Sequence, residues 1–160
     1  HMEVMAPHHY TQLFFLDEAT AFAAGHRPCF ECRRSDAKRF FEAWRTGNPI
    51  LAGEGIPKVD AVDAALQHER LTRDRMKLTF EATLWQSPDG VFVVRAGAPK
   101  DAWLLWQEKL WRWSAGGYID STPALPAETV RVLTPKSIVQ AFTAGYVPVV
   151  HSSADGDECV

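Results

Sequence analysis

The stretch Lys77-Leu78-Thr79-Phe80-Glu81-Ala82-Thr83-Leu84 changes the pattern of this sequence from helical to extended. Its apolar side chains alternate with polar ones, which is typical of a strand with one buried face. Helical spacing dominates before it, and short strand-like runs separated by Gly or Pro dominate after it. We therefore predict an α+β fold: a small helical region around the Cys29-x-x-Cys32 pair, then a helix and a mainly antiparallel sheet or partly closed barrel.

On the C-terminal side, Ser87-Pro88-Asp89-Gly90 is a strong turn signal. It predicts that residues 91–95 return as the strand paired with 77–84. After these we predict strands at 102–106, 110–113, 118–121 and 129–133. A helix at 135–144, ended by Gly145, and an edge strand at 146–150 complete the chain.

On the N-terminal side we predict a buried strand at 12–16 and two short helices at 18–24 and 36–45. A Gly/Pro-rich loop at 46–57 and a third helix at 60–72 follow them. Asp17 is the expected N-cap of the first helix, and Gly25 ends it. The loop suggests a boundary between a region at 10–46, which carries the Cys29-x-x-Cys32 pair and is therefore expected to bind metal, and a sheet domain at 58–151. Residues 152–160 read as a disordered acidic tail.

The composition is that of an ordinary globular protein without a membrane span or a disulfide framework. The chain has 160 residues, 46% of them hydrophobic, and a formal net charge of -3. No apolar run is long enough to span a bilayer, so we expect no membrane contact. Three cysteines are too few for a disulfide framework, and with no export signal we expect the cytoplasm.

The most chemically distinctive stretch is Ala24-Gly25-His26-Arg27-Pro28-Cys29-Phe30-Glu31-Cys32-Arg33-Arg34. Two thiolates separated by two residues can bind one metal ion from a single tight turn, which is how half of a tetrahedral zinc site is built. A thioredoxin-like redox pair and a pair of ordinary thiols are the other interpretations. A helix ending in Gly precedes the pair, which disfavours the redox setting.

Several residues around this motif resemble the N-terminal metal-binding domain of the Ada family of DNA alkylation-response proteins. They are Leu13-Phe14-Phe15, Ala23-Ala24-Gly25 and Arg27-Pro28-Cys29-x-x-Cys32-Arg33, within about 13–36. In that family four cysteines hold zinc, the domain binds DNA, and one cysteine accepts a methyl group from a phosphotriester. The resemblance implies zinc-ligand roles for Cys29 and Cys32.

The family's other cysteine pair lies about thirty residues before the knuckle, and no residue of this chain corresponds to it. The resemblance therefore carries the methyl-acceptor role to no residue here. His8, His9 or His26 could complete the site, with His8 and His9 the chemically adequate candidates. A ligand pair upstream of this sequence and a relic site are the alternatives.

Basic residues flank the knuckle although the whole chain is acidic. Those expected to contact a DNA backbone at the start of the second helix are Arg27, Arg33, Arg34, Lys38 and Arg39. A solvated surface with no partner is the competing interpretation.

The leading hypothesis is therefore a DNA-binding protein with a zinc knuckle, linked to DNA damage or modification and without a methyl-acceptor cysteine. One alternative is a metal-dependent nuclease or related hydrolase using His68 or His151 with nearby carboxylates. Another is a non-catalytic interaction module. Five tryptophans of the second half could stack on bases or pack a core: Trp85, Trp103, Trp106, Trp111 and Trp113.

Overall fold

Helices give way to strands close to Lys77 in the computed structural model, which describes residues 13–155. Within that range the first helices are α1 (Glu18–Ala23), α2 (Arg34–Gly47), α3 (Pro49–Ala52) and α4 (Val59–Arg70). The strands are β1 (Phe80–Thr83), β2 (Phe92–Arg95), β3 (Ala98–Trp106), β4 (Lys109–Ser114), β5 (Gly117–Pro123) and β6 (Thr129–Val132). Helix α5 (Lys136–Thr143) follows, with 3-10 turns η1 (Leu84–Gln86) and η2 (Ser152–Ala154). The predicted α+β class is confirmed.

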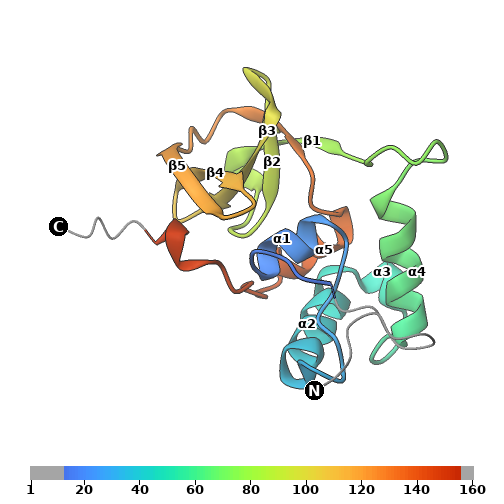
Figure 1. Ribbon diagram of the computed structural model, residues 1–160. Coiled ribbons are helices and arrows are strands. Elements are labelled where there is room, and N and C mark those ends of the chain that lie inside the picture. The colour runs from blue at the N-terminus through green and yellow to red at the C-terminus, as the bar shows by residue number, and fades with distance from the viewer. Residues whose placement is uncertain (1–12, 156–160) are drawn as a thin grey trace.

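The strands form one antiparallel sheet in the order β1-β6-β2-β3-β4-β5. Strands β1 and β5 are its two edges, so the sheet is open and not a closed barrel. Figure 1 shows the sheet on one side of the molecule and α2, α3 and α4 on the other, with α1 and α5 between them. Among residues 13–155, no helix is both long and apolar enough to cross a membrane.

The predicted pairing of 77–84 with 91–95 is wrong. Strand β1 pairs with β6, at Phe80 opposite Val132, while β2 pairs with β6 and β3. The chain leaves β1 through η1, where the amide of Leu84 donates to Glu128 O at 3.0 Å. This bond holds η1 beside the residue that precedes β6. The chain then crosses to the other side of β6, where β2 pairs with that strand.

Two other strand predictions are wrong. Residues 13–16 form no strand, and Phe14 is 82% exposed. Residues 146–150 are also not a strand, because the amide of Val149 donates to the carboxylate of Glu18 at 2.8 Å instead of to a neighbouring strand. The predicted loop at 46–57 contains α3, which begins with Pro49 at its first position.

The tail prediction also needs correction. Residues 152–154 form η2, and Ala154 is fully buried. Residues 156–160 lie outside the described residues. Ordered structure therefore extends past the predicted start of the tail at Ser152.

Buried side chains cover both faces of the sheet. The larger cluster joins Phe40 and Trp44 of α2 to Val93 of β2 and Ile138 of α5. Side chains of the segments predicted as separate regions, 10–46 and 58–151, therefore share one core. The smaller cluster lies on the other face of the sheet and includes Ala19, Phe92, Leu104, Trp111 and Tyr118. Trp103 and Trp111 are each 7% exposed, so both pack in the core, whereas Trp85 is 70% exposed.

Candidate metal centre

The Cys29–Cys32 turn lies between α1 and α2 and is shaped by backbone hydrogen bonds. Gly25 ends α1 with φ at +82°, and the amide of His26 donates to Ala21 O at 2.9 Å. At the other end, the amide of Arg33 donates to Cys29 O at 2.8 Å. A left-handed residue after a helix favours Gly, which explains the Gly in this motif.

Both cysteines are exposed free thiols. The amide of Glu31 donates to Cys29 Sγ at 3.4 Å. Backbone N–H groups of Cys32 and Glu31 lower the pKa of the Cys29 thiol because they stabilise its thiolate, while the neighbouring Cys29 charge raises the pKa of Cys32. Two close, exposed sulfurs with amides directed at one of them are suited to a thiophilic metal ion.

The described residues supply only these two sulfur ligands. Residues 13–155 contain no group of three or more His, Cys, Asp or Glu side chains that could hold a metal ion. His26 packs against Phe15 with ring centroids 5.3 Å apart and the rings tilted by 44°, and burial together with nearby Arg70 lowers the pKa of its imidazole. His8 and His9, the predicted further ligands, lie outside the described residues. The donor chemistry fits zinc at two of its four positions.

Two of the arginines predicted to contact DNA anchor the turn to its neighbours. Arg27 forms a bidentate pair with Asp63 of α4 at 2.6 and 2.7 Å and stacks on Phe30 and Phe41. Its side chain is only 17% exposed. Arg33 lies 3.1 Å from the carboxylate of Glu18, on α1, whose side chain is 3% exposed. These guanidinium groups hold the turn against α4 and α1.

A third predicted contact residue, Arg39, is also paired. It donates to Asp36 at 2.5 Å, and its guanidinium lies 5.4 Å from the centre of the Tyr146 ring. Bonds from Arg39 and then Arg33 lower the pKa of the Asp36 carboxyl. Arg39 remains 58% exposed on its side chain, so one edge of it faces solvent.

The remaining predicted cations, Arg34 and Lys38, are exposed on the first turns of α2. Arg34 makes one long bond, from Nε to Phe30 O at 3.4 Å. Neither cation forms a salt bridge with another described residue. They are therefore the members of the predicted set with the most freedom to contact a phosphate.

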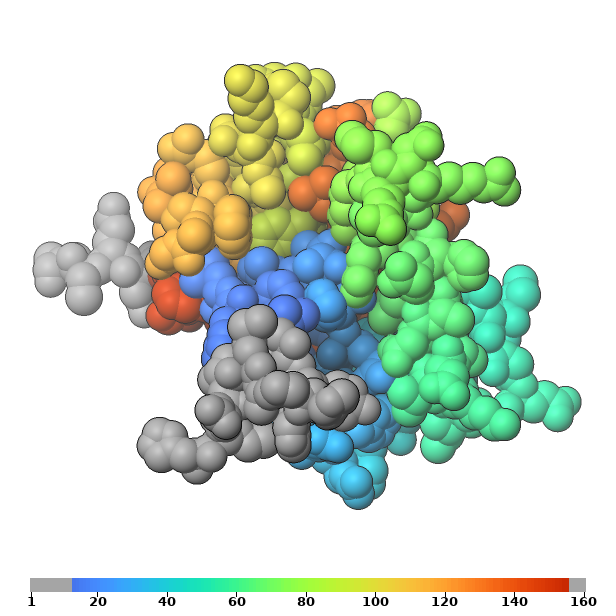
Figure 2. Space-filling view, turned by 45° about the vertical axis from the view of Figure 1, so that its right-hand side comes forward, coloured from blue at the N-terminus to red at the C-terminus, as the bar shows by residue number. Residues whose placement is uncertain are grey.

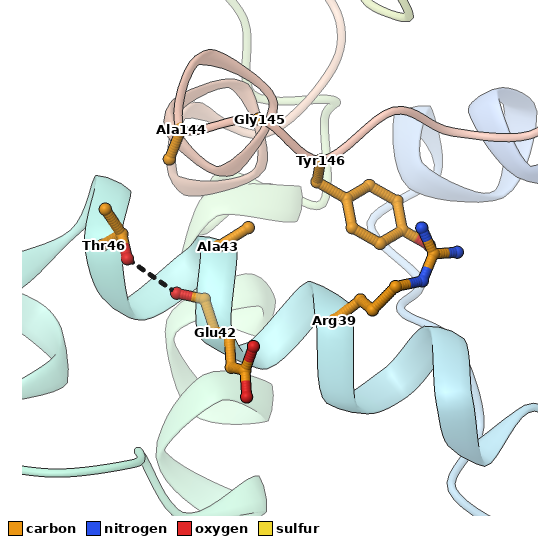
Figure 3. Close-up of a pocket in the computed structure, with 7 residues that line it drawn as sticks. All are labelled: Arg39, Glu42, Ala43, Thr46, Ala144, Gly145 and Tyr146. Atoms are coloured by element: carbon orange, nitrogen blue, oxygen red, sulfur yellow. Dashed lines mark hydrogen bonds between the residues drawn. The ribbon is translucent and has the colours of Figure 1, made fainter.

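A shallow pocket of about 320 Å³ lies farther along α2, between that helix and the end of α5. Figure 3 shows Arg39 and Tyr146 at one end of it and Glu42 and Thr46 at the other. The hydrogen bond drawn there runs from Thr46 Oγ1 to the backbone oxygen of Glu42.

The histidines considered for a hydrolase take separate places. His68 lies exposed on α4, and its neighbour Glu69 accepts bonds from the amide and hydroxyl of Ser137. His151 Nδ1 lies 2.8 Å from Ser153 Oγ and accepts from the Ser153 amide, as an N-cap does. Glu69 and Ser153 therefore make structural hydrogen bonds. Within residues 13–155, neither histidine belongs to a cluster that could hold a metal ion.

Sequence reasoning missed the long-range contacts of two acidic residues that position this region. Asp17 caps α1 at Thr20 and accepts from the Tyr118 hydroxyl at 2.7 Å. Glu18 accepts from the Tyr146 hydroxyl at 2.7 Å in addition to pairing with Arg33. Only the capping role of Asp17 had a signal in the sequence.

No protein-family model, curated protein or solved structure matches this chain. The likeness to the Ada-type domain therefore stays a resemblance over one short segment.

Proposed function

We propose that this chain binds a zinc ion through Cys29 and Cys32 and contacts the phosphate backbone of DNA through exposed cations at the start of α2. The observation that carries the proposal is the exposed thiol pair on an anchored turn, with the Glu31 amide directed at the Cys29 sulfur. Free cysteine is among the residue types most often buried, so two exposed thiols on one turn favour a role in binding.

Zinc requires ligands in addition to the two thiolates, because protein sites are four-coordinate. His8 and His9 are suitable candidates from this chain, and residues upstream of this sequence or a second molecule are other sources. Zinc would act structurally, fixing the turn that carries the first residues of α2.

The metal part is tested by titrating Co²⁺ or Zn²⁺ into the purified protein. Cys29→Ser and Cys32→Ser should each weaken binding strongly and remove the thiolate-to-cobalt absorption band. Cys159→Ser is the matched control, since it removes the remaining thiol of the chain. Equal metal affinity in all four proteins would rule out the thiol site.

The DNA part rests on Arg34 and Lys38, which lie just after Cys32 and are exposed. Lysine and arginine contacts to phosphates release counterions, so affinity falls with salt by about 0.9 log units per log unit of salt for each contact. Replacing both residues with Ala should therefore weaken binding and reduce the slope by about 1.8.

Lys100 of β3 and Arg131 of β6 supply the control, because they are exposed cations on the sheet. A double Ala variant at these positions changes the net charge equally and should bind DNA as the wild type does. If both double variants lose the same affinity, binding follows net charge alone and the α2 contact is wrong.

A further inference from the structure

Three basic residues lie at the C-terminal end of α1, and two of them donate to backbone oxygens there. Arg70, the last residue of α4, donates from Nη2 to Gly25 O at 3.3 Å. Lys77 donates from Nζ to Ala23 O at 2.5 Å. His26 follows Gly25 directly, and burial, together with the charge of nearby Arg70, lowers the pKa of its imidazole. Figure 2 shows the end of α4 and the segment after it, in green, directly beside α1, in blue.

These cations have no acidic partner within residues 13–155. Neither Arg70 nor Lys77 forms a salt bridge there, and Arg70 Nε is buried without a hydrogen-bond acceptor. The adjacent carboxylate, Glu69, is occupied by Ser137. Burial, and then Arg70, lowers the pKa of Lys77 to about 8, as expected for an amine held beside another cation.

An unpaired cation that is partly withdrawn from water is costly unless an anion compensates for it. Carbonyl groups at the end of α1 supply only partial negative charge. Among residues 13–155, the cluster therefore has more positive charge than the neighbouring groups balance, and its donors come from three segments of the chain.

We propose that His26, Arg70 and Lys77 form a binding site for a phosphate group. A guanidinium, an ammonium and an imidazole approaching from separate segments can each contact a different oxygen of a tetrahedral anion, whereas a carboxylate offers only two oxygens. The site uses neither the thiols nor the cations of α2, so it stands or falls independently of the proposed function.

The first test uses the wild-type protein. Lysines are acetylated under limiting reagent with inorganic phosphate, or with chloride or acetate at matched ionic strength, and modification is followed by peptide mass spectrometry. Phosphate at ten times its dissociation constant should slow modification of Lys77 about tenfold. Lys100, exposed on β3, is the internal control and should react at the same rate throughout.

Three outcomes would overturn the proposal: no protection of Lys77, equal protection by acetate, or equal protection of Lys100. The second test compares melting temperatures of the wild type, Lys77→Met and Lys100→Met in phosphate and in chloride. The phosphate-dependent rise should be present in the wild type and Lys100→Met and absent in Lys77→Met. A rise that persists in Lys77→Met would show that phosphate binds elsewhere.

Discussion

Replacing Arg33 with Ala should destabilise the fold far more than replacing its neighbour Arg34. The Arg33 guanidinium is 3.1 Å from Glu18, whose side chain is 3% exposed. Removing one partner of a buried ion pair costs about 3–5 kcal/mol, because the other charge stays buried. Since the Arg33 side chain is 39% exposed, water can partly replace it, and we expect the lower end, about 3 kcal/mol.

Urea unfolding followed by tryptophan fluorescence measures this difference directly. For a chain of this size, about 3 kcal/mol corresponds to a fall in melting temperature of roughly 6–12 °C. Arg34→Ala is the control: it removes the same charge but only a 3.4 Å bond to Phe30 O, so it should cost no more than about 0.5 kcal/mol.

A double-mutant cycle with Glu18→Gln separates the ion pair from other effects of Arg33. With no buried charge left to compensate, Arg33→Ala should cost about 1–3 kcal/mol less in the Glu18→Gln background. Equal costs in both backgrounds, or equal costs for Arg33→Ala and Arg34→Ala, would refute the structural role given to this arginine.

Three other changes follow from the described contacts. Gly47→Ala should cost about 2–3 kcal/mol in urea unfolding, because its Cβ would lie 2.3 Å from a backbone oxygen of α5; Gly97→Ala, with open space around it, should be nearly neutral. The pKa of Lys77 is about 8 in the folded state and 10.5 when unperturbed, so the unfolded chain binds more protons between these values; wild-type stability should therefore rise relative to Lys77→Met as the pH rises through this window. Burial and the bond to Asp17 raise the pKa of Tyr118, so its contribution is complete below about pH 10 and is lost above it as the unfolded phenol ionises. Tyr118→Phe should cost about 1 kcal/mol at neutral pH and weaken that alkaline decline in a pH series of unfolding curves.

Local signals in the sequence were sufficient for most element positions. Asp17 caps α1 as predicted, with its carboxylate accepting from the Thr20 amide at 2.8 Å. Alternation at 77–84 predicted β1, and Gly or Pro punctuation predicted the other strands, although β3 begins at Ala98, before the predicted 102–106. Strand partners were harder to predict, because β1 and β6 are far apart in the sequence and no turn joins them. The apolar run at 12–16 led to a wrong strand prediction, because an apolar pattern does not show whether a sheet is near enough to bury it. Phe14 is 82% exposed.

The candidate site shows a similar division. The spacing of Cys29 and Cys32 predicted a shared turn with two thiols, and the structure has that turn with both thiols exposed. Which arginines are free could not be predicted, because the acidic partner of Arg27 is 36 residues away, at Asp63. The basic cluster of His26, Arg70 and Lys77 also forms only because the end of α4 lies beside α1. No sequence pattern indicates that these two helices are neighbours.

The basic residues near the Cys29–Cys32 turn are of two kinds: some form ion pairs with other described residues and some do not. The two kinds must be tested with different substitutions. Arg33 follows Cys32 directly and is paired with the buried carboxylate of Glu18, the first residue of α1, so this ion pair links the residue after the second thiol to α1. Removing Arg33 would disturb the thiol turn and stability together, and a resulting loss of DNA binding would say nothing about a phosphate contact. Arg34 and Lys38 lack such pairs among the described residues, so their removal changes surface charge with little effect on the turn. The DNA hypothesis is decided by those residues alone.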